Sequence, residues 1–146
     1  MTDFLGASKK IIRDSDPDDL LFAAARLGIA WPNPTIGISI YDQDGELEAV
    51  VAYNNHIYDS CHAHIWSNGA RRWANKSALR AMFAIPFIAN GLSRVWLPIA
   101  ASNIPSQILA LKLGFRFDAK LTGMRDGADE VVMMMTRDEC RWIRDD

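Results

Sequence analysis

Apolar residues recur along the chain with two different periods, and the change of period predicts a mixture of strands and helices. Runs in which apolar and polar residues alternate predict strands, and runs with apolar residues three and four positions apart predict helices. The predicted elements are, in chain order, strand 8–13, helix 17–27, strands 35–41, 47–54 and 60–66, helix 76–89, strand 94–100, helix 104–113, and strands 115–121 and 130–136. This order predicts one α/β (α+β) domain over residues 1–146.

Turn residues between these elements predict how the strands are connected. The sequence Asp-Gln-Asp-Gly at 42–45 predicts an antiparallel hairpin, and a looser turn is expected at 56–59. A longer connection is expected at 122–127, between the last two strands. Consecutive hairpins followed by a strand–helix–strand crossover predict a mixed, mostly antiparallel central sheet with helices on both faces.

Two prolines interrupt predicted elements. Pro86 lies inside helix 76–89 and should kink or shorten it, and Gly91 should end it. Pro98 lies inside strand 94–100, although proline cannot donate a hydrogen bond to a neighbouring strand. Either 94–100 is an edge strand, or it diverges from its neighbour and opens a slot in the sheet for an extended ligand.

The composition narrows the class of protein. The 146 residues are 49% hydrophobic and 23% charged, as in a globular domain. The net charge of −2 gives no indication of a nucleic-acid or anionic-membrane partner. No segment approaches the roughly 20 apolar residues of a membrane span, and the N-terminus lacks a signal-peptide core, so we expect a cytoplasmic protein. Cys61 and Cys140 have no metal-like spacing and predict two reduced thiols, with a disulfide as the alternative.

The junction between strand 60–66 and helix 76–89 is basic, with the sequence RRWANK at 71–76. Free N–H groups and the positive dipole end of a helix N-terminus, together with neighbouring cations, can hold a pyrophosphate. The junction matches neither of the two common glycine-rich nucleotide motifs. A solvated basic loop is the alternative.

The stretch NIPSQILALKLGFRF at 103–117 resembles a motif of the GNAT superfamily of acyl-CoA-dependent N-acyltransferases, and the chain is most similar to the small GNAT-like proteins of bacteriophages. The family often has N-x-x-[AS]-x-x-L-Y-x-K-x-G-F. The matching positions are Asn103, Ser106, Leu109, Lys112, Gly114 and Phe115. The family's tyrosine, a frequent general acid, is replaced by Ala110. The resemblance covers about 41–136 and extends weakly to 11–20.

The resemblance implies that acetyl-CoA, as co-substrate, lies between strands 60–66 and 94–100. An amine acceptor, a small molecule or a protein, would attack the thioester directly through a tetrahedral intermediate, and a backbone N–H near Trp66 would stabilise the oxyanion. The cofactor-binding residues implied are Ile65, Trp66, Arg71, Arg72, Trp73, Ala74, Asn75, Lys76, Ser77, Asn103 and Ser106. The phosphate loop is degenerate, because Ala74 and Lys76 replace its small residues. A homodimer is compatible with the sequence.

Histidines supply the candidate general base. Alternation along strand 60–66 places His62, His64 and Trp66 on one face, beside the implied slot. A histidine with a pKa near the working pH can act as a base, so His64, with His62 behind it, is the predicted catalytic residue; a structural histidine is the alternative. Two functions remain open: an N-acetyltransferase, and a weakly active or inactive GNAT-like module that binds CoA or has a structural or interaction role.

Overall fold

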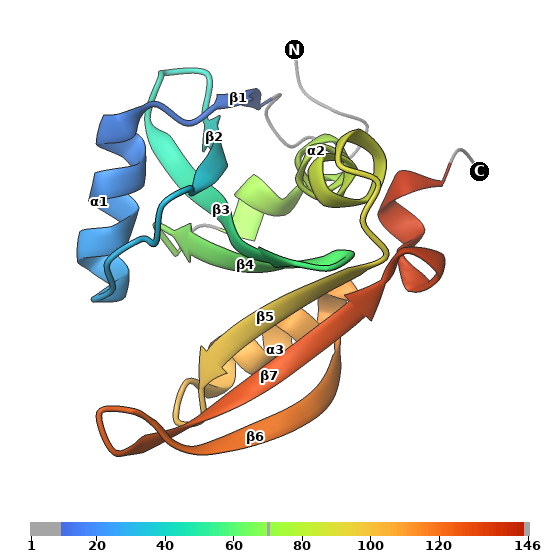
Figure 1. The fold of residues 1–146 in the computed structure, drawn as a ribbon. Helices are drawn as coiled ribbons and strands as arrows, with labels where there is room; N and C mark the ends of the chain where they lie inside the picture. Colours follow the sequence, from blue (N-terminus) through green and yellow to red (C-terminus); the bar gives the residue numbers. More distant parts are fainter. Residues whose placement is uncertain (1–9, 70, 145–146) are drawn as a thin grey trace.

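A mixed sheet of seven strands lies at the centre of the computed structural model, which describes residues 10–69 and 71–144 and only the backbone of residues 71 and 72 (Figure 1). The strands are β1 (Ile11–Asp14), β2 (Ile36–Tyr41), β3 (Leu47–Ile57), β4 (Ser60–Ser67), β5 (Arg94–Ala100), β6 (Arg116–Arg125) and β7 (Ala128–Thr136). Their order is β1-β2-β3-β4-β5-β7-β6, and all neighbours are antiparallel except β4 and β5. The predicted mixed, mostly antiparallel sheet is confirmed.

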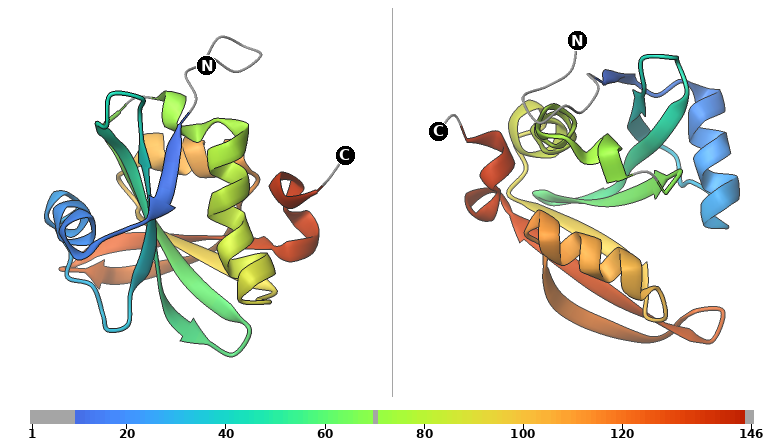
Figure 2. Two further views of the ribbon diagram at one scale, coloured as in Figure 1. Left: turned by 90° about the horizontal axis from the view of Figure 1, so that it is seen from above. Right: turned by 180° about the vertical axis from the view of Figure 1, so that it is seen from behind.

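Helices cover both faces of this sheet, with α1 on one face and α2 and α3 on the other (Figures 1 and 2). The helices are α1 (Pro17–Leu27), α2 (Lys76–Ala84) and α3 (Ile104–Leu113), and shorter helical turns occupy Arg71–Ala74, Ile85–Ala89, Arg137–Glu139 and Arg141–Ile143. Asp16 caps α1, because its side chain accepts a hydrogen bond from the N–H of Asp19 at 2.8 Å. Across the described residues, none of the helices has the length and apolar character that crossing a membrane requires.

The boundaries of most elements are as predicted, and two connections were predicted wrongly. The strand predicted at 8–13 is β1 in its described part; residues 8 and 9 lie outside the described residues. β3 extends to Ile57, so the turn expected at 56–59 is shorter. β6 continues to Arg125, and only Asp126 and Gly127 connect it to β7. Both have positive φ, 48° and 89°, as a tight type I′ hairpin requires.

Pro86 shortens the second helix as predicted. Regular α2 ends at Ala84, and the chain continues as a π-helical turn over Ile85–Ala89 that contains Pro86. Proline has no N–H to donate to the preceding turn, so the α-helical hydrogen-bond pattern cannot continue unchanged through it. The segment ends before Gly91, whose φ is 64°.

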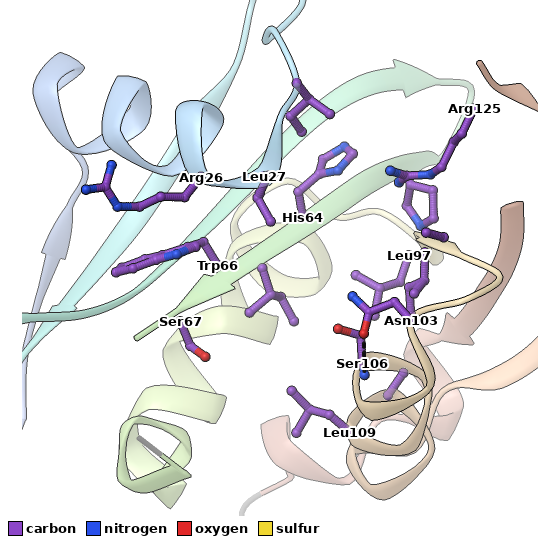
Figure 3. Close-up of a pocket in the computed structure, with 16 residues that line it drawn as sticks. Arg26, Leu27, His64, Trp66, Ser67, Leu97, Asn103, Ser106, Leu109 and Arg125 are labelled. Atoms are coloured by element: carbon purple, nitrogen blue, oxygen red, sulfur yellow. Dashed lines mark hydrogen bonds between the residues drawn. The ribbon is translucent and has the colours of Figure 1, made fainter. Parts of the chain in front are cut away.

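β4 and β5 pair over three residues only and then diverge (Figures 1 and 3). The paired residues are Ser60 with Arg94, Cys61 with Val95 and His62 with Trp96. Beyond this point β4 runs on to Ser67 and β5 to Ala100 without pairing to each other. On its other side β5 pairs with β7 along its whole length, and Pro98 lies opposite Val132. β5 is therefore an interior strand that diverges from its neighbour, the second of the two interpretations of Pro98.

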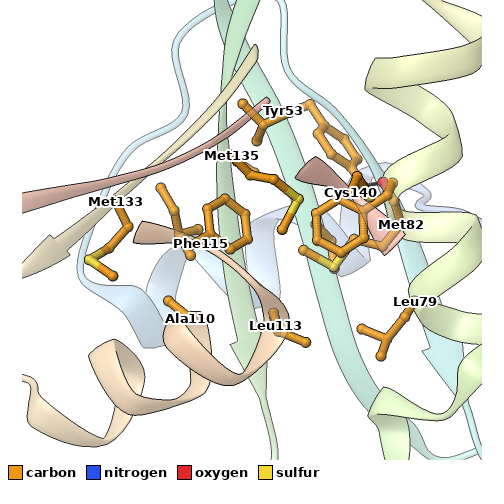
Figure 4. Close-up of a cluster of buried hydrophobic side chains, with 14 of the residues drawn as sticks. Tyr53, Leu79, Met82, Ala110, Leu113, Phe115, Met133, Met135 and Cys140 are labelled. Carbon is orange, nitrogen blue, oxygen red and sulfur yellow. Dashed lines mark hydrogen bonds between the residues drawn. The ribbon is translucent and has the colours of Figure 1, made fainter. Parts of the chain in front are cut away.

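The main apolar core lies between the sheet and the helices α2 and α3 (Figure 4). It contains large side chains from several elements, among them Tyr53, Phe83, Phe87, Phe115, Met133 and Met135. The Tyr53 hydroxyl donates to the carbonyl oxygen of Met82, so the one polar atom of this side chain is satisfied inside the core. Cys61 and Cys140 are buried free thiols, which confirms the prediction of two reduced cysteines.

Phe83 and Phe117 form a matched pair for testing this core. Phe83 is 1% exposed and Phe117 is 57% exposed. We expect Phe83→Ala to lower the free energy of unfolding by about 3–5 kcal/mol, because it leaves a cavity among packed aromatic rings. Phe117→Ala should change it by less than about 1 kcal/mol. Urea unfolding of the two variants measures both values, and equal effects would contradict the assignment of the core.

Candidate functional site

A cavity of about 410 Å³ occupies the gap between the diverging strands (Figure 3). Its walls come from five parts of the chain. They are Arg26, Leu27 and Ile29 at the end of α1; His64, Ile65, Trp66 and Ser67 of β4; Leu97, Pro98, Ile99 and Ala100 of β5; Asn103, Ser106, Leu109 and Ala110 of α3; and Arg125 of β6. Because α1 and α3 lie on opposite faces, the cavity passes through the sheet between β4 and β5.

The start of α3 forms one wall, and hydrogen bonds hold it in place. The side chain of Asn103 caps the helix by accepting from the N–H of Ser106 at 3.2 Å. The side-chain amide of Gln107 donates to the carbonyl oxygens of Ala100 and Ala101, at 3.3 and 2.9 Å. These bonds fix the first turn of α3 to the end of β5. Asn103 and Ser106 both border the cavity, and Asn103 is also the helix cap; their contact with a cofactor stays a prediction.

The basic junction follows the Ser67 end of the cavity in sequence, and none of its residues 73–77, whose side chains the structure describes, lines the cavity. Trp73 is buried in the core, so only its backbone is available to a ligand. Asn75 caps α2 by accepting from the N–H of Ala78 at 2.9 Å. Lys76 and Ser77, in the first turn of α2, are exposed. The side chains of the two predicted arginines, Arg71 and Arg72, lie outside the described residues.

A chain of hydrogen bonds determines which nitrogen of His64 carries the proton. The Thr35 hydroxyl donates to the carbonyl oxygen of Pro32 and accepts from the amide nitrogen of Asn54 at 3.4 Å. The amide oxygen of Asn54, which is fully buried, then faces His64 Nε2 at 3.2 Å. Since this oxygen only accepts hydrogen bonds, Nε2 is protonated and Nδ1 keeps its lone pair. The ring of His64 is thereby fixed in one tautomer.

His64 is neutral at physiological pH. Burial, with smaller contributions from His62 and Arg125, lowers its pKa to about 4. Burial has this effect because it disfavours the charged imidazolium. An efficient general base has a pKa near the working pH, so the ring of His64 is better suited to accepting a hydrogen bond through Nδ1 than to holding a full proton.

His62 lies at a second cavity, of about 370 Å³, further along the same face of β4. This cavity is lined by Asn55, Ile57, Tyr58, Asp59, Ser60, His62, Arg94 and Trp96. The side chain of Asn55 donates to His62 Nδ1 at 3.3 Å, and the rings of His62 and His64 are 6.4 Å apart between centroids. Burial lowers the pKa of His62 as well. The two histidines thus face neighbouring cavities that follow one another along β4.

Arg125 is a residue of the site that the sequence analysis missed. It lies at the end of the cavity near His64 (Figure 3). Its Nε donates to Glu130 Oε1 at 2.8 Å, and the two side chains are 33% and 13% exposed. Residues 122–127 were predicted as a loop, whereas Arg125 is the last residue of β6. The Asp-Gly pair at 126–127 is a signal for a two-residue hairpin and would have extended the strand to Arg125.

Metal chemistry has no support among the side chains that the structure describes: no group of three or more His, Cys, Asp or Glu residues there is placed to hold a metal ion. The polar groups at the two cavities are instead amides, hydroxyls, histidines and arginines with one aspartate. Such groups bind and orient organic ligands by hydrogen bonds.

Comparison with known proteins gives structural matches. No family model and no curated protein matches the sequence. A chimera of the spermidine N-acetyltransferase SpeG from Vibrio cholerae and hSSAT is 16% identical over 94% of this chain and 100% of its own, with a TM-score of 0.74. The dodecameric spermidine N-acetyltransferase of Vibrio cholerae is 16% identical over 88% of this chain and 94% of its own, with a TM-score of 0.71. A putative ribosomal-protein-serine acetyltransferase from the same organism is 22% identical over 70% of this chain and 64% of its own, with a TM-score of 0.59.

These likenesses show that the chain has the GNAT fold, with its mixed sheet and diverging central strands. At 14–22% identity they establish the fold alone. The activity has to be argued from the residues of the site.

The depressed pKa of His64 makes stability depend on pH. Below about pH 6.5 the unfolded chain protonates this histidine, whereas the folded protein resists protonation down to about pH 4, so stability falls as the pH falls through this window. We expect urea unfolding to show a loss from this residue of about 2 kcal/mol between pH 7 and pH 4.5. The free energy of unfolding of His64→Gln should fall by correspondingly less between pH 7 and pH 4.5.

His56→Gln is the matched control, because His56 is an exposed histidine of β3 outside both cavities. It should show the same pH dependence as the wild type. An unchanged pH dependence in His64→Gln would contradict the buried, neutral state of His64.

Proposed function

We propose that this protein is an acyl-CoA-dependent N-acyltransferase that transfers the acetyl group of acetyl-CoA to an amine. The observation that carries the proposal is the divergence of β4 from β5 after His62 and Trp96, which opens a cavity of about 410 Å³ through the sheet. An extended pantetheine chain with amide groups fits such a gap, because the facing edges of the two strands have backbone groups that do not pair with each other.

The donor is proposed to enter from the Ser67 end. Its diphosphate would lie at the start of α2, where the N–H of Ala78 is taken by the cap and those of Lys76 and Ser77 have no hydrogen-bond partner among the described residues. Free N–H groups and the helix dipole favour an anion there. Arg71 and Arg72 precede this helix in sequence and would add positive charge. Asn103 and Ser106 would contact the pantetheine from the opposite wall.

The chemical step is proposed as direct attack. The amine nitrogen bonds to the thioester carbon, and a backbone N–H of β4 near Trp66 stabilises the oxyanion. The intermediate then collapses, the C–S bond breaks, and CoA leaves as its thiolate. His64 Nδ1 or a water accepts the amine proton; the pKa of about 4 favours a role for His64 in orienting the amine or the water. Ala110 has no hydroxyl to protonate the thiolate, which takes its proton from water.

The other candidate is a weakly active or inactive module of the same fold. Ala110 and the degenerate phosphate loop favour it. The names of the structural neighbours, all acetyltransferases, support the enzyme. A homodimer also stays a prediction, and the dodecameric neighbour is an example of assembly in this fold. The cytoplasmic location and the likeness to bacteriophage proteins stay predictions from the sequence alone.

Binding of acetyl-CoA is the first test of the proposal. Acetyl-CoA should raise the melting temperature with increasing concentration, with a stabilisation of about 2.7 kcal/mol at one hundred times Kd. Asn103→Ala combined with Arg71→Ala should abolish the shift, because contacts at both ends of the donor are removed. An unchanged melting temperature at millimolar acetyl-CoA would contradict donor binding.

Asn103→Ser separates ligand binding from helix capping. Serine retains a side-chain oxygen that caps α3, whereas Asn103→Ala should lose about 1 kcal/mol of stability without ligand. We therefore expect Asn103→Ser to keep the stability of the free protein and to reduce the shift caused by acetyl-CoA. A normal shift in Asn103→Ser would remove Asn103 from the proposed donor site.

His64→Ala tests the predicted catalytic residue. Turnover, followed as release of free CoA thiol, should fall by about tenfold to a hundredfold, because the acceptor proton loses its hydrogen-bond partner. The thermal shift with acetyl-CoA should remain. His56→Ala, an exposed control outside both cavities, should keep full turnover. Full turnover in His64→Ala would assign proton transfer to water or to another residue.

A further inference from the structure

We propose that Arg125 binds a carboxylate of the substrate group that reacts beside His64, so that this enzyme acts on a carboxylate-bearing substrate and not on a polyamine. The inference rests on the proposed acyl transfer and specifies its substrate class. The charged side chains around the two cavities differ from the anions that a substrate with several ammonium groups requires.

The charged side chains lining the larger cavity are both arginines. Among the 16 described residues that line it, Arg26 and Arg125 are the charged ones, and none is Asp or Glu. Arg26 lies over the ring of Phe22 at 3.4 Å, and Phe22 contacts Trp66 near the end of β4. Arg125 lies at the other end, near His64 (Figure 3). Each end of the cavity therefore carries one cation, and Arg125 is the one at the reacting end.

Arg125 is held in position and keeps hydrogen-bonding capacity. Its Nε donates to Glu130 Oε1 at 2.8 Å, while its terminal Nη atoms make no hydrogen bond to any residue that the structure describes. The tight turn at 126–127 fixes the strand that carries it against β7, which carries Glu130. Two free N–H-bearing atoms on a planar fork match the two oxygens of a carboxylate. With the side chain 33% exposed, the guanidinium is accessible from the cavity.

The nearby carboxylates already have partners. Glu130 is 13% exposed and pairs with Arg125. Asp59, the one acidic residue among the described lining of the second cavity, accepts a hydrogen bond from the Ser93 hydroxyl and lies in a cavity that also contains Arg94. A polyamine brings several ammonium groups, each of which needs an acceptor or an anion when it leaves water. The spermidine activity in the names of the structural neighbours therefore does not fit this charge arrangement.

The carboxylate has two chemically equivalent sources. It can belong to the acceptor, as in an amino acid, or to a dicarboxylic acyl group of the donor. Both would place the same anion beside Arg125 during the transfer, and both require the same bond changes: a C–N bond forms, the C–S bond of the thioester breaks and the amine proton is lost.

Lysine and cadaverine (1,5-diaminopentane) are the decisive acceptor pair, because they differ only by the α-carboxylate. With acetyl-CoA as donor, release of CoA thiol is measured for each, and for spermidine. If the acceptor supplies the carboxylate, the wild type should prefer lysine by about tenfold or more, the size of one charged hydrogen-bonded pair. In a second arm, cadaverine is the acceptor and succinyl-CoA is compared with acetyl-CoA. A similar preference for succinyl-CoA would assign the carboxylate to the donor.

Three variants show whether Arg125 is responsible. Arg125→Gln should abolish the preference for lysine over cadaverine, or for succinyl-CoA over acetyl-CoA, whichever the wild type shows. Glu130→Gln removes the partner but keeps the cation, so the preference should persist. Arg116→Gln is the matched control, because Arg116 is also a β6 arginine paired with a glutamate, Glu139, but does not line either cavity. A wild type that prefers cadaverine or spermidine, or shows no preference in both arms, overturns the inference, as does a preference that survives Arg125→Gln.

A binding measurement separates this inference from the proposed function. If no amine releases CoA thiol, acyl transfer fails, but lysine and cadaverine can still be titrated against the protein while the His64 ring resonances are followed by NMR. Lysine should shift these resonances in the wild type and in Arg116→Gln, and not in Arg125→Gln. Succinyl-CoA and acetyl-CoA are titrated in the same way, to cover a carboxylate on the donor. The inference is overturned, independently of turnover, if lysine shifts these resonances no more than cadaverine does and succinyl-CoA no more than acetyl-CoA does.

Discussion

The early end of the pairing between β4 and β5 is the constraint on which the site depends. Parallel strands normally continue their hydrogen-bond ladder, and an interruption leaves backbone groups to be satisfied by water or by a ligand. Here the ladder ends after His62 and Trp96, and Pro98 follows two residues later with no N–H to offer. The other edge of β5 is fully paired with β7, so the gap opens without loosening the rest of the sheet.

Polar side chains then fix the walls of the gap. Asn103 caps α3, Gln107 holds the start of this helix to the end of β5, and Asn54 fixes the tautomer of His64 from inside the sheet. Of these three amides Asn54 is the buried one, and a buried amide is costly unless its polar atoms are paired. The cost is acceptable here because these amides orient the groups that face the cavity, which lowers the ordering required when a ligand binds.

The order of elements and the bounds of β5 and α3 could be predicted from the sequence, because they depend on local periodicity, caps and turns. That His64, Trp66, Asn103 and Ser106 lie around one gap was implied by the resemblance to the GNAT family, and all four line the same cavity. The sequence could not place Arg125, since the side of the sheet that a residue near a hairpin reaches depends on a bulge and on strand register. It also could not predict the low pKa of His64, which arises from burial by segments distant in sequence. Local signals therefore predicted the strands and the helix that form the walls of the site, whereas the position of Arg125 and the pKa of His64 depend on tertiary structure.

Because the backbone of the site and its charged side chains are determined separately, the fold alone does not identify the substrate. In the proposed function, the backbone gap and the start of α3 bind what acyl-CoA donors have in common, an extended amide chain, and a gap of this kind depends on the backbone more than on particular side chains. The end of the cavity beside His64, where we propose that the substrate group reacts, includes the side chain of Arg125 from β6, and such side chains can differ completely between two proteins of the same fold. A likeness at 16% identity to a spermidine acetyltransferase is therefore compatible with a cavity whose charged lining residues, among those described, are arginines. The proposed preference for a carboxylate-bearing substrate accordingly rests on Arg125 and its unpaired Nη atoms, and the fold has no part in it.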